Sequence, residues 1–427
     1  MILAGKKAAY ITLGCKLNFS ETSTLKHRLE EAGVLTVGEK EGADIFVINT
    51  CSVTDVAEKK GRQTIRKIIH RNPDAYIVVV GCYAQLRAQE IQQIEGVNLV
   101  LGAGEKFNVA HYLAHSQERE NCEPHSCNIF RLDRFDLAYS FGDRTRCFLK
   151  IQDGCDYFCS YCTIPFARGK SRSASIPQVV KAVRDVASKG IREIILTGVN
   201  TGDFGQQTQE TFMQLLQTLD SLEVIDRFRI SSVEPNLLTD EIIRFIASSR
   251  KFMPHFHIPL QSGHNEVLRL MKRRYDTELF AEKVNTVRTY RPDAFIGVDV
   301  IAGMRGETEK FFEDACRFIE KLDISRLHVF PYSERRGTQA LNIPGPVSPA
   351  EKHRRVETLL RLSEQKLESF YRRFEGQNRQ VLFEDTENNG TIYGFTDNYI
   401  RVGVPFDPAL ANRIVPITLT AGIFHKD

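Results

Sequence analysis

Apolar and polar positions alternate between two periods along residues 1–115. Short apolar runs of strand character are separated by longer stretches in which apolar residues recur at helical spacing. The strand-like runs are Ala8–Leu13, Asp44–Asn49, Ala75–Val80 and Asn98–Leu101, and the helical stretches include Ser20–Glu31, Thr54–Ile69 and Arg87–Ile94. Strands that alternate with helices predict an α/β domain, here a small doubly wound parallel sheet.

The same alternation returns on a larger scale over residues 141–345, within a domain that we expect to span 141–373, after a polar segment at 116–140 that we interpret as a linker. The strand candidates are Cys147–Gln152, Glu193–Thr197, Arg229–Ser232, Phe256–Pro259, Phe295–Ile301 and Arg326–Pro331. Repeated strand–helix units predict a closed or partial (β/α) barrel. Pro349–Arg373 then indicates one long polar helix.

The pattern changes again at residues 374–427. Short β-rich runs are separated by Asn-Gly, Asp-Asn and Pro turn signals. The runs are Gln380–Phe383, Gly390–Phe395, Tyr399–Val404 and Arg413–Leu419. A small C-terminal β-barrel fits this tail.

Charge and composition narrow the function classes. The 427 residues contain 57 Lys and Arg against 54 Asp and Glu, a net charge of +3, which is too balanced for a protein that coats nucleic acid indiscriminately. No apolar run reaches the length of about 18 residues that a membrane helix needs, and the start has no signal-peptide core. We therefore expect a cytoplasmic protein without a membrane partner.

The ten cysteines are the first chemical lead, because disulfides are improbable in a reducing compartment. Cys155, Cys159 and Cys162 lie on a Gly-containing loop directly after a predicted strand. Three thiolates can hold an iron–sulfur cubane and leave one iron open for a ligand. Zinc is the main competitor, but a structural zinc site needs four ligands and no fourth is present at a usual spacing.

A second set of cysteines is dispersed in the sequence. Cys15, Cys51 and Cys82 each follow the carboxyl end of a predicted strand in the first domain. The ends of parallel strands converge on one crevice, so we expect these three side chains to meet in space. The other four form no such set; they are Cys122, Cys127, Cys147 and Cys316.

The motifs around these cysteines resemble the radical S-adenosylmethionine (SAM) methylthiotransferases over essentially the whole chain. The motifs are Thr12–Asn18, Asn49–Thr54, Val79–Gln85 and Cys155–Cys162 followed by Ile164–Gly169. Gly14–Asn18 and His328–Thr338 are most similar to the MtaB branch, which acts on N6-threonylcarbamoyladenosine in tRNA. One departure is Gly303–Thr308, where Met304 and Arg305 replace the usual Phe and Pro.

The resemblance implies a radical SAM barrel with a C-terminal TRAM domain, and two 4Fe-4S clusters. It implies that Cys155, Cys159 and Cys162 hold the cluster that cleaves SAM. It assigns the auxiliary cluster, which delivers the methylthio group to C2 of the adenine, to Cys15, Cys51 and Cys82. tRNA, as the substrate, and an electron-donor protein are the implied partners, and we expect a monomer.

Supporting cofactor contacts are implied at the strand ends of the barrel. They are Thr197, Gly198 and Asn200, then Ser232 and Glu234, then His257 and Gln261, with Tyr161 between two cluster ligands. Each could equally be a helix cap or a turn former, and Tyr161 could simply cover the cluster.

A threonylcarbamoyl group presents a carboxylate, which favours recognition by a bidentate Arg. The candidates on motif loops are Arg273, Arg274, Arg305 and Arg336. Each could instead hold a tRNA phosphate.

Three alternative functions stay open on the sequence. The enzyme could modify another tRNA adenosine, or an aspartate of a ribosomal protein. A non-catalytic iron–sulfur protein that binds RNA is the alternative from a different class, although a structural cluster gains nothing from an open iron.

Overall fold

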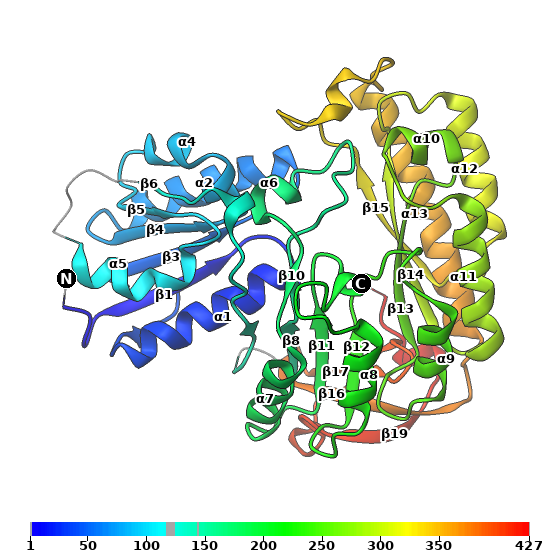
Figure 1. Ribbon diagram of the computed structural model, residues 1–427. Helices are drawn as coiled ribbons and strands as arrows, with labels where there is room; N and C mark the ends of the chain where they lie inside the picture. The colour runs from blue at the N-terminus through cyan, green and yellow to red at the C-terminus, as the bar shows by residue number, and fades with distance from the viewer. Residues whose placement is uncertain (1, 117–123, 143–144, 427) are drawn as a thin grey trace.

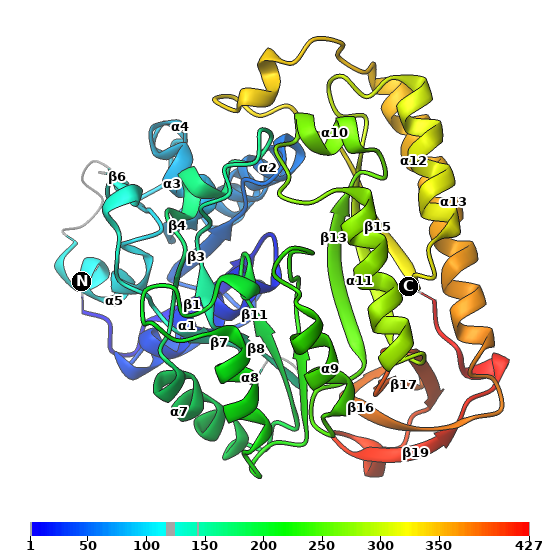
Figure 2. The same ribbon diagram turned by 45° about the vertical axis from the view of Figure 1, so that its right-hand side comes forward.

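The computed structural model describes residues 2–116, 124–142 and 145–426, so Cys122 lies outside the described residues. Figures 1 and 2 show an N-terminal α/β layer beside a larger group of strands and helices, with the C-terminal strands at the lower end of the latter. The two regular parts meet along α1 (Lys16–Glu31), which contacts β7 (Ala138–Tyr139) and β8 (Arg146–Lys150).

The N-terminal sheet is parallel throughout, in the order β2-β1-β3-β4-β5-β6. Its strands are β1 (Lys7–Thr12), β2 (Leu35–Thr36), β3 (Ile45–Thr50), β4 (Tyr76–Gly81), β5 (Leu99–Leu101) and β6 (Pro124–His125). β3 is buried along its whole length, which explains its unbroken apolar run.

Helices cover both faces of this sheet. Leu25 of α1 packs on one face with Leu113 of α5 (Val109–His115). The other face is covered by α2 (Asp55–Arg71), α3 (Cys82–Leu86) and α4 (Ala88–Gln92). The predicted doubly wound domain is therefore confirmed as a fold.

The central strands form one curved, mostly parallel row. β7, β8, β11 (Glu193–Thr197) and β12 (Arg227–Ile230) make one sheet, and β13 (His255–Gln261), β14 (Phe295–Ala302) and β15 (Arg326–Pro331) make the next. Bridges from Phe228 to Phe252 and from Ser232 to His257 join the two sheets, which gives a partial barrel. The short β9 (Gln152–Asp153) and β10 (Arg172–Ser173) pair beside it.

The outer face of this barrel is apolar and is covered by helices. Ile194, Phe256, Ile258 and Val298 belong to the main core cluster. The covering helices are α7 (Ile176–Ala187), α8 (Phe212–Asp220), α9 (Asp240–Ser248), α11 (Thr277–Tyr290), α12 (Glu309–Lys321) and α13 (Pro349–Arg372). The short α10 (Asn265–Leu270) packs instead in a separate small cluster with Met304 and Tyr332. Because side chains alternate along a strand, the intervening residues face the interior of the barrel.

The C-terminal sheet is antiparallel and curled, in the order β18-β17-β16-β19, as expected for a small barrel. Its strands are β16 (Asn378–Asn388), β17 (Thr391–Thr396), β18 (Arg401–Pro405) and β19 (Ile414–Thr418). Val381 and Ile392 pack against Phe370 of α13 and Phe295 of β14. The tail is thus attached to the barrel by an apolar core of its own.

Short strands occupy the segment that the sequence predicts as a linker. β6 joins the N-terminal sheet and β7 joins the barrel, with one 3₁₀ turn, Ile129–Arg131, between them. The domain boundaries at 115, 140 and 373 stay predictions. Within the described residues, no helix is long and apolar enough to cross a membrane.

Candidate active site

Cys15, Cys51 and Cys82 stand at the carboxyl ends of β1, β3 and β4, which are adjacent in the sheet. Two glycines allow the sharp turns after the strands: Gly14 has φ +117° and Gly81 has φ +102°. A Cβ on Gly14 would lie 2.7 Å from Cβ of Cys51, so the two loops touch. The structure therefore brings the three dispersed cysteines to one crevice.

The surroundings of this triad differ between its members. Cys51 and Cys82 are buried, whereas Cys15 is exposed. Burial and the neighbouring Cys82 thiol raise the pKa of Cys51 to about 12. A metal centre that binds thiolates would remove this penalty, since coordination displaces the proton.

The loop with Cys155, Cys159 and Cys162 follows β9 and ends at α6 (Ile164–Arg168). Each sulfur accepts one hydrogen bond: from the backbone N–H of Tyr157 (3.5 Å), from Nη1 of Arg273 (3.1 Å) and from the backbone N–H of Ile164 (3.4 Å). Donors aimed at sulfur stabilise bound thiolates, so these residues fit an iron–sulfur cluster.

The spacing of the cysteines also bears on the kind of metal centre. Among the described residues, only His257, Asp299 and His328 place three ligand atoms within 4.8 Å of one another, close enough for a single ion. Neither cysteine triad is so compact. A wider triad suits a multi-iron cluster better than a mononuclear zinc site.

The expected cofactor contacts gather at the strand ends above the cluster loop. Oγ1 of Thr197 and Oδ1 of Asn200 are buried and have no hydrogen-bond partner, which suits a polar ligand at this position. A Cβ on Gly198 would come within 2.8 Å of Oε1 of Gln152, and that same oxygen accepts from the backbone N–H of Asn200 (2.9 Å). Gln152 thus links the cluster loop to the next strand end.

Glu234 and Arg273 form an ion pair beside Cys159. Burial raises the pKa of Glu234, and Arg273 opposes that rise. Gln261, at the end of β13, has a left-handed φ of +65° after a register shift in the strand. Tyr161 packs on a small apolar cluster that includes Met271.

The other two expected contacts lie lower. Ser232 accepts a hydrogen bond at its carbonyl from Oγ1 of Thr201 (2.7 Å) and forms an isolated β-bridge with His257. His257 lies four residues before Gln261 on β13, so it stands deeper in the barrel than the strand-end residues.

The four arginines expected to read the substrate have different surroundings. Arg273 is 4% exposed and held by Cys159 and Glu234, while Nε of Arg305 donates to Oε1 of Glu334 (2.7 Å). Arg274 stacks on the ring of Tyr157, 3.9 Å from its centroid, and Arg336 is exposed. The structure does not bring the four together.

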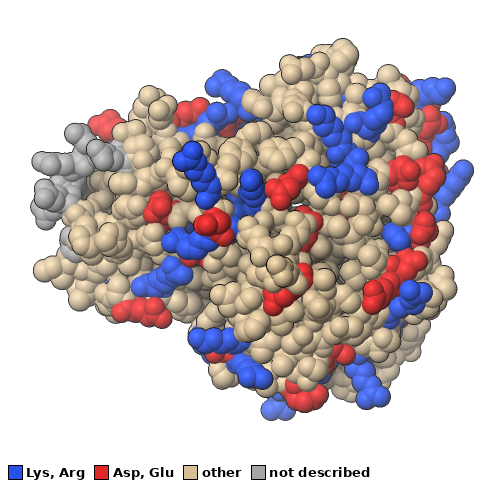
Figure 3. Space-filling view, viewed as in Figure 1, with Lys and Arg blue, Asp and Glu red and all other residues tan. Residues whose placement is uncertain are grey.

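On the face seen in Figure 3, Lys and Arg are mixed with Asp and Glu, and one group of basic side chains lies over the upper end of β15.

A buried network of charges between the two cluster loops is not evident from the sequence. Arg168 donates to Asn18 (2.8 Å), Glu21 (3.0 Å) and Asp153 (2.9 Å). Among the described residues, its charged members are Lys106, Lys150, Arg168 and Arg172 against Glu21 and Asp153. Four cations face two carboxylates, and the surplus positive charge favours an anionic centre at the adjacent cysteines.

Comparisons with known proteins agree with this geometry. Residues 7–102 match the family described as "Uncharacterized protein family UPF0004", and residues 149–319 match the radical SAM superfamily. The threonylcarbamoyladenosine tRNA methylthiotransferase MtaB of Bacillus subtilis is 39% identical over 96% of this chain and 93% of its own length. The chain belongs to the radical SAM methylthiotransferase family. The Aquifex aeolicus enzyme of the same name is 37% identical over 93% of this chain and 96% of its own.

Solved structures show the same fold at low identity. TsrM from Kitasatospora setae, a radical S-adenosylmethionine methyltransferase, matches with a TM-score of 0.56 at 16% identity over 76% of this chain and 73% of its own. Membership of the methylthiotransferase family gives this enzyme two 4Fe-4S clusters and SAM as cofactors.

Proposed function

We propose that this methylthiotransferase converts N6-threonylcarbamoyladenosine, next to the anticodon of tRNA, to its 2-methylthio derivative. The observation that carries the proposal is the agreement of five relatives named for this substrate, 31–39% identical over nearly the whole chain. A tRNA-2-methylthio-N(6)-dimethylallyladenosine synthase from Pelotomaculum thermopropionicum is 30% identical over 97% of this chain and 95% of its own. Both kinds of relative are named for methylthio transfer to a tRNA adenosine, so the experiment has to distinguish the substituent on N6 of that adenosine.

Two cysteine sets would hold the cofactors. We assign the SAM-cleaving cluster to Cys155, Cys159 and Cys162. We assign the auxiliary cluster to Cys15, Cys51 and Cys82. The clusters and SAM supply the radical chemistry that replaces the C2 hydrogen of the adenine with a methylthio group.

The protein's own residues position these groups. Arg273 donates to the sulfur of Cys159 and neutralises Glu234, so the cluster loop and the end of β12 keep a fixed relation. Thr197 and Asn200 offer unpaired buried oxygens to a polar cofactor group. Tyr161, between two of the cluster ligands, packs on a small apolar cluster and so supports the loop.

The proposed reaction also requires partners outside the chain. Reduction of the SAM-cleaving cluster needs an electron from outside the chain, so we infer an electron-donor protein, and we expect a cytoplasmic monomer. tRNA is the macromolecular substrate.

The test compares two tRNAs of one sequence, one with threonylcarbamoyladenosine and one with dimethylallyladenosine. The reconstituted enzyme is incubated anaerobically with SAM and a reductant, and the nucleosides are then analysed by mass spectrometry. We expect the 2-methylthio product only from the first tRNA. A product only from the second would refute the proposed substrate. Modification of neither tRNA by an enzyme that still forms 5′-deoxyadenosine would also refute it, and the aspartate of a ribosomal protein would then be the next substrate to test.

A further inference from the structure

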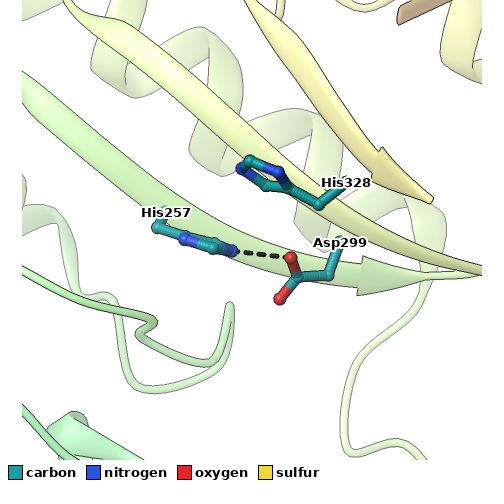
Figure 4. Close-up of side chains that lie close together, drawn as sticks. All are labelled: His257, Asp299 and His328. Atoms are coloured by element: carbon teal, nitrogen blue, oxygen red, sulfur yellow. Dashed lines mark hydrogen bonds and ion pairs between the residues drawn. The ribbon is translucent and has the colours of Figure 1, made fainter. Parts of the chain in front are cut away.

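Three polar side chains stand on the inner face of the barrel. His257 on β13, Asp299 on β14 and His328 on β15 are among the residues that alternate with the outer apolar core (Figure 4). His257 and Asp299 keep 16% and 19% of their side-chain surface exposed, so water reaches the face they line. None of the three has a part in holding a cluster.

Within the trio, His257 and Asp299 are hydrogen-bonded and His328 stacks on the ring of His257. Nε2 of His257 lies 2.7 Å from Oδ1 of Asp299, and the rings of His257 and His328 stack with centroids 5.1 Å apart and planes at 28°. Figure 4 shows the His257 ring directed at the Asp299 carboxylate, with His328 above it. Nε2 of His257 is already engaged in the hydrogen bond to Asp299. The stacked rings of His257 and His328 do not direct their nitrogen lone pairs at one point, as two ligands of a single ion would. These features disfavour a metal ion despite the short spacing.

His328 is neutral at physiological pH. Burial and the neighbouring His257 lower its pKa to about 4. A neutral imidazole offers one N–H donor and one acceptor nitrogen. It can therefore bind a hydroxyl, an amide or a carboxylate without bringing a buried charge of its own.

A cation reaches the same space from the N-terminal domain. Lys16 is the first residue of α1 and adjoins Cys15, and its ammonium lies 6.0 Å from the ring centroid of Phe148 on β8. Phe148 alternates with the outer core residues of β8, so it faces the interior. Lys16 is also among the charges that lower the pKa values of Asp299 and His328.

Two of the arginines expected to bind the substrate carboxylate are engaged elsewhere. Arg273 is held by Cys159 and Glu234, and Arg305 by Glu334 and the carbonyls of Leu341 (3.2 Å) and Ile343 (3.1 Å). Lys16 instead adjoins the auxiliary cysteine loop, and its ammonium extends towards Phe148 inside the barrel.

We propose that Lys16 and His328 bind the threonylcarbamoyl group of the substrate, Lys16 the carboxylate and His328 the threonyl hydroxyl or carbamoyl oxygen. The inference rests on the proposed function and adds the residues that read the N6 substituent. C2 and N6 flank N1 on the Watson–Crick edge of adenine, so an adenine with C2 at the clusters places its N6 substituent beside the auxiliary cysteine loop, from which the substituent can extend into the barrel. His257 lies four residues before the end of β13, which places it about 13 Å below the carboxyl end of the barrel. The His257–Asp299 pair acts as a positioning group, because it fixes the ring on which His328 stacks.

The experiment uses the reconstituted holoenzyme and two substrates. One tRNA carries threonylcarbamoyladenosine, and the other carries the same group with its carboxylate converted to the neutral primary amide. For Lys16→Met we expect kcat/KM on the carboxylate substrate to fall about tenfold to a hundredfold, the usual loss for one charge-assisted hydrogen bond, with a much smaller change on the amide. Lys16→Arg should retain most of the activity. His328→Gln, which keeps a donor, should be milder than His328→Ala on both substrates.

Several outcomes would overturn the inference. Equal losses on carboxylate and amide for Lys16→Met would give Lys16 a structural role, and unchanged kcat/KM in His328→Ala would remove His328 from the site. Iron content reports whether Lys16→Met disturbs the Cys15 loop, and 5′-deoxyadenosine formation without tRNA reports whether the SAM-cleaving cluster stays intact. If either quantity changes in Lys16→Met, the His328 variants test the inference instead. Stoichiometric Co²⁺ binding to the apoprotein that is lost in His328→Ala would show a metal site instead. If wild-type enzyme modifies neither tRNA, the proposed function itself fails.

Discussion

Nη2 of Arg168 donates a hydrogen bond to Oδ1 of Asn18 across 2.8 Å, and both side chains are buried. Arg168 ends α6, directly after the loop with Cys155, Cys159 and Cys162. Asn18 lies one turn after Cys15 and donates to the carbonyls of Leu13 (2.9 Å) and Thr50 (3.1 Å). One guanidinium therefore fixes the two cysteine loops relative to each other.

Arg168→Met should destabilise the protein strongly. The change leaves Glu21 and Asp153 with fewer partners in a fully buried network, and breaking such a network costs about 3–5 kcal/mol. We expect a lower urea midpoint and, in protein that stays folded, a lower iron content, because the loop with Cys15 loses its anchor. Iron analysis and circular dichroism measure the two effects.

Arg317→Met is the matched control for this variant. Arg317 lies on α12 with 59% of its side chain exposed, and its partners are two residues of its own helix. It should change the free energy of unfolding by no more than about 0.5 kcal/mol, so the urea midpoint should hardly move. A midpoint for Arg168→Met as high as that of Arg317→Met would refute the anchoring role.

The sequence predicts the fold well because strand and helix periods are local properties. The expected strand Glu193–Thr197 coincides with β11, and Arg326–Pro331 coincides with β15. The convergence of Cys15, Cys51 and Cys82 is also predictable, since strand order in a parallel sheet determines where strand ends meet.

Contacts between domains are not local, and the sequence does not reveal them. Arg168 and Glu21 are 147 positions apart and meet only when α1 docks on the barrel. Arg335 is a similar case: it pairs with Glu58 and donates to Ser52 (2.9 Å), whereas the exposed Arg336 beside it was the sequence candidate. In the sequence, such a pair is signalled only by a charged residue next to a cluster motif. Many exposed residues have the same position, so this signal does not identify the pairs.

Stability should fall as the pH falls from about 6.5 towards 4, partly because of His328. Burial and His257 lower the pKa of His328 from 6.5 to about 4, so the unfolded chain binds a proton in this window that the folded protein does not. Stability therefore rises with pH through the window and is retained above it. From pH 7 to pH 5 the loss attributable to His328 is roughly 2 kcal/mol. Urea midpoints at several pH values measure it.

His328→Gln should flatten this dependence without abolishing it, because burial lowers the pKa of His255 in the same direction. His353→Gln is the control, since His353 is 75% exposed on α13. Identical slopes for wild type and His328→Gln would show that His328 does not titrate in the window.

The two cysteine triads should be separable by mutation. Replacing Cys155, Cys159 and Cys162 by Ala should leave roughly half of the iron and abolish 5′-deoxyadenosine formation, because thiolates are the cluster anchors. Replacing Cys15, Cys51 and Cys82 should spare 5′-deoxyadenosine formation and remove methylthio transfer. Loss of all iron in both triple variants would indicate one shared site.

The C-terminal sheet closes the amino-terminal end of the barrel. Arg229 donates to the carbonyls of Thr396 (2.8 Å) and Asp397 (2.8 Å) and to Glu193 (2.9 Å), and Arg227 donates to the carbonyl of Gln380 (2.9 Å). Deletion of the tail from Glu375 would expose these buried charges and the apolar cluster around Phe370. A deletion therefore cannot separate RNA binding from folding, and point variants are needed.

Arg401→Ala should weaken tRNA binding while leaving 5′-deoxyadenosine formation nearly unchanged. The guanidinium of Arg401 stacks 4.5 Å from the ring centroid of Tyr393, on the face of the sheet opposite the apolar cluster that contains Val402 and Ile392. Small barrels bind RNA with such pairs of basic and aromatic side chains. If Arg401 contacts a phosphate, the slope of log affinity against log salt should become shallower by about one. Arg372→Ala, on α13 with 72% of its side chain exposed, serves as the control. Equal affinities and equal salt slopes for Arg401→Ala and wild type would show that tRNA does not contact this face.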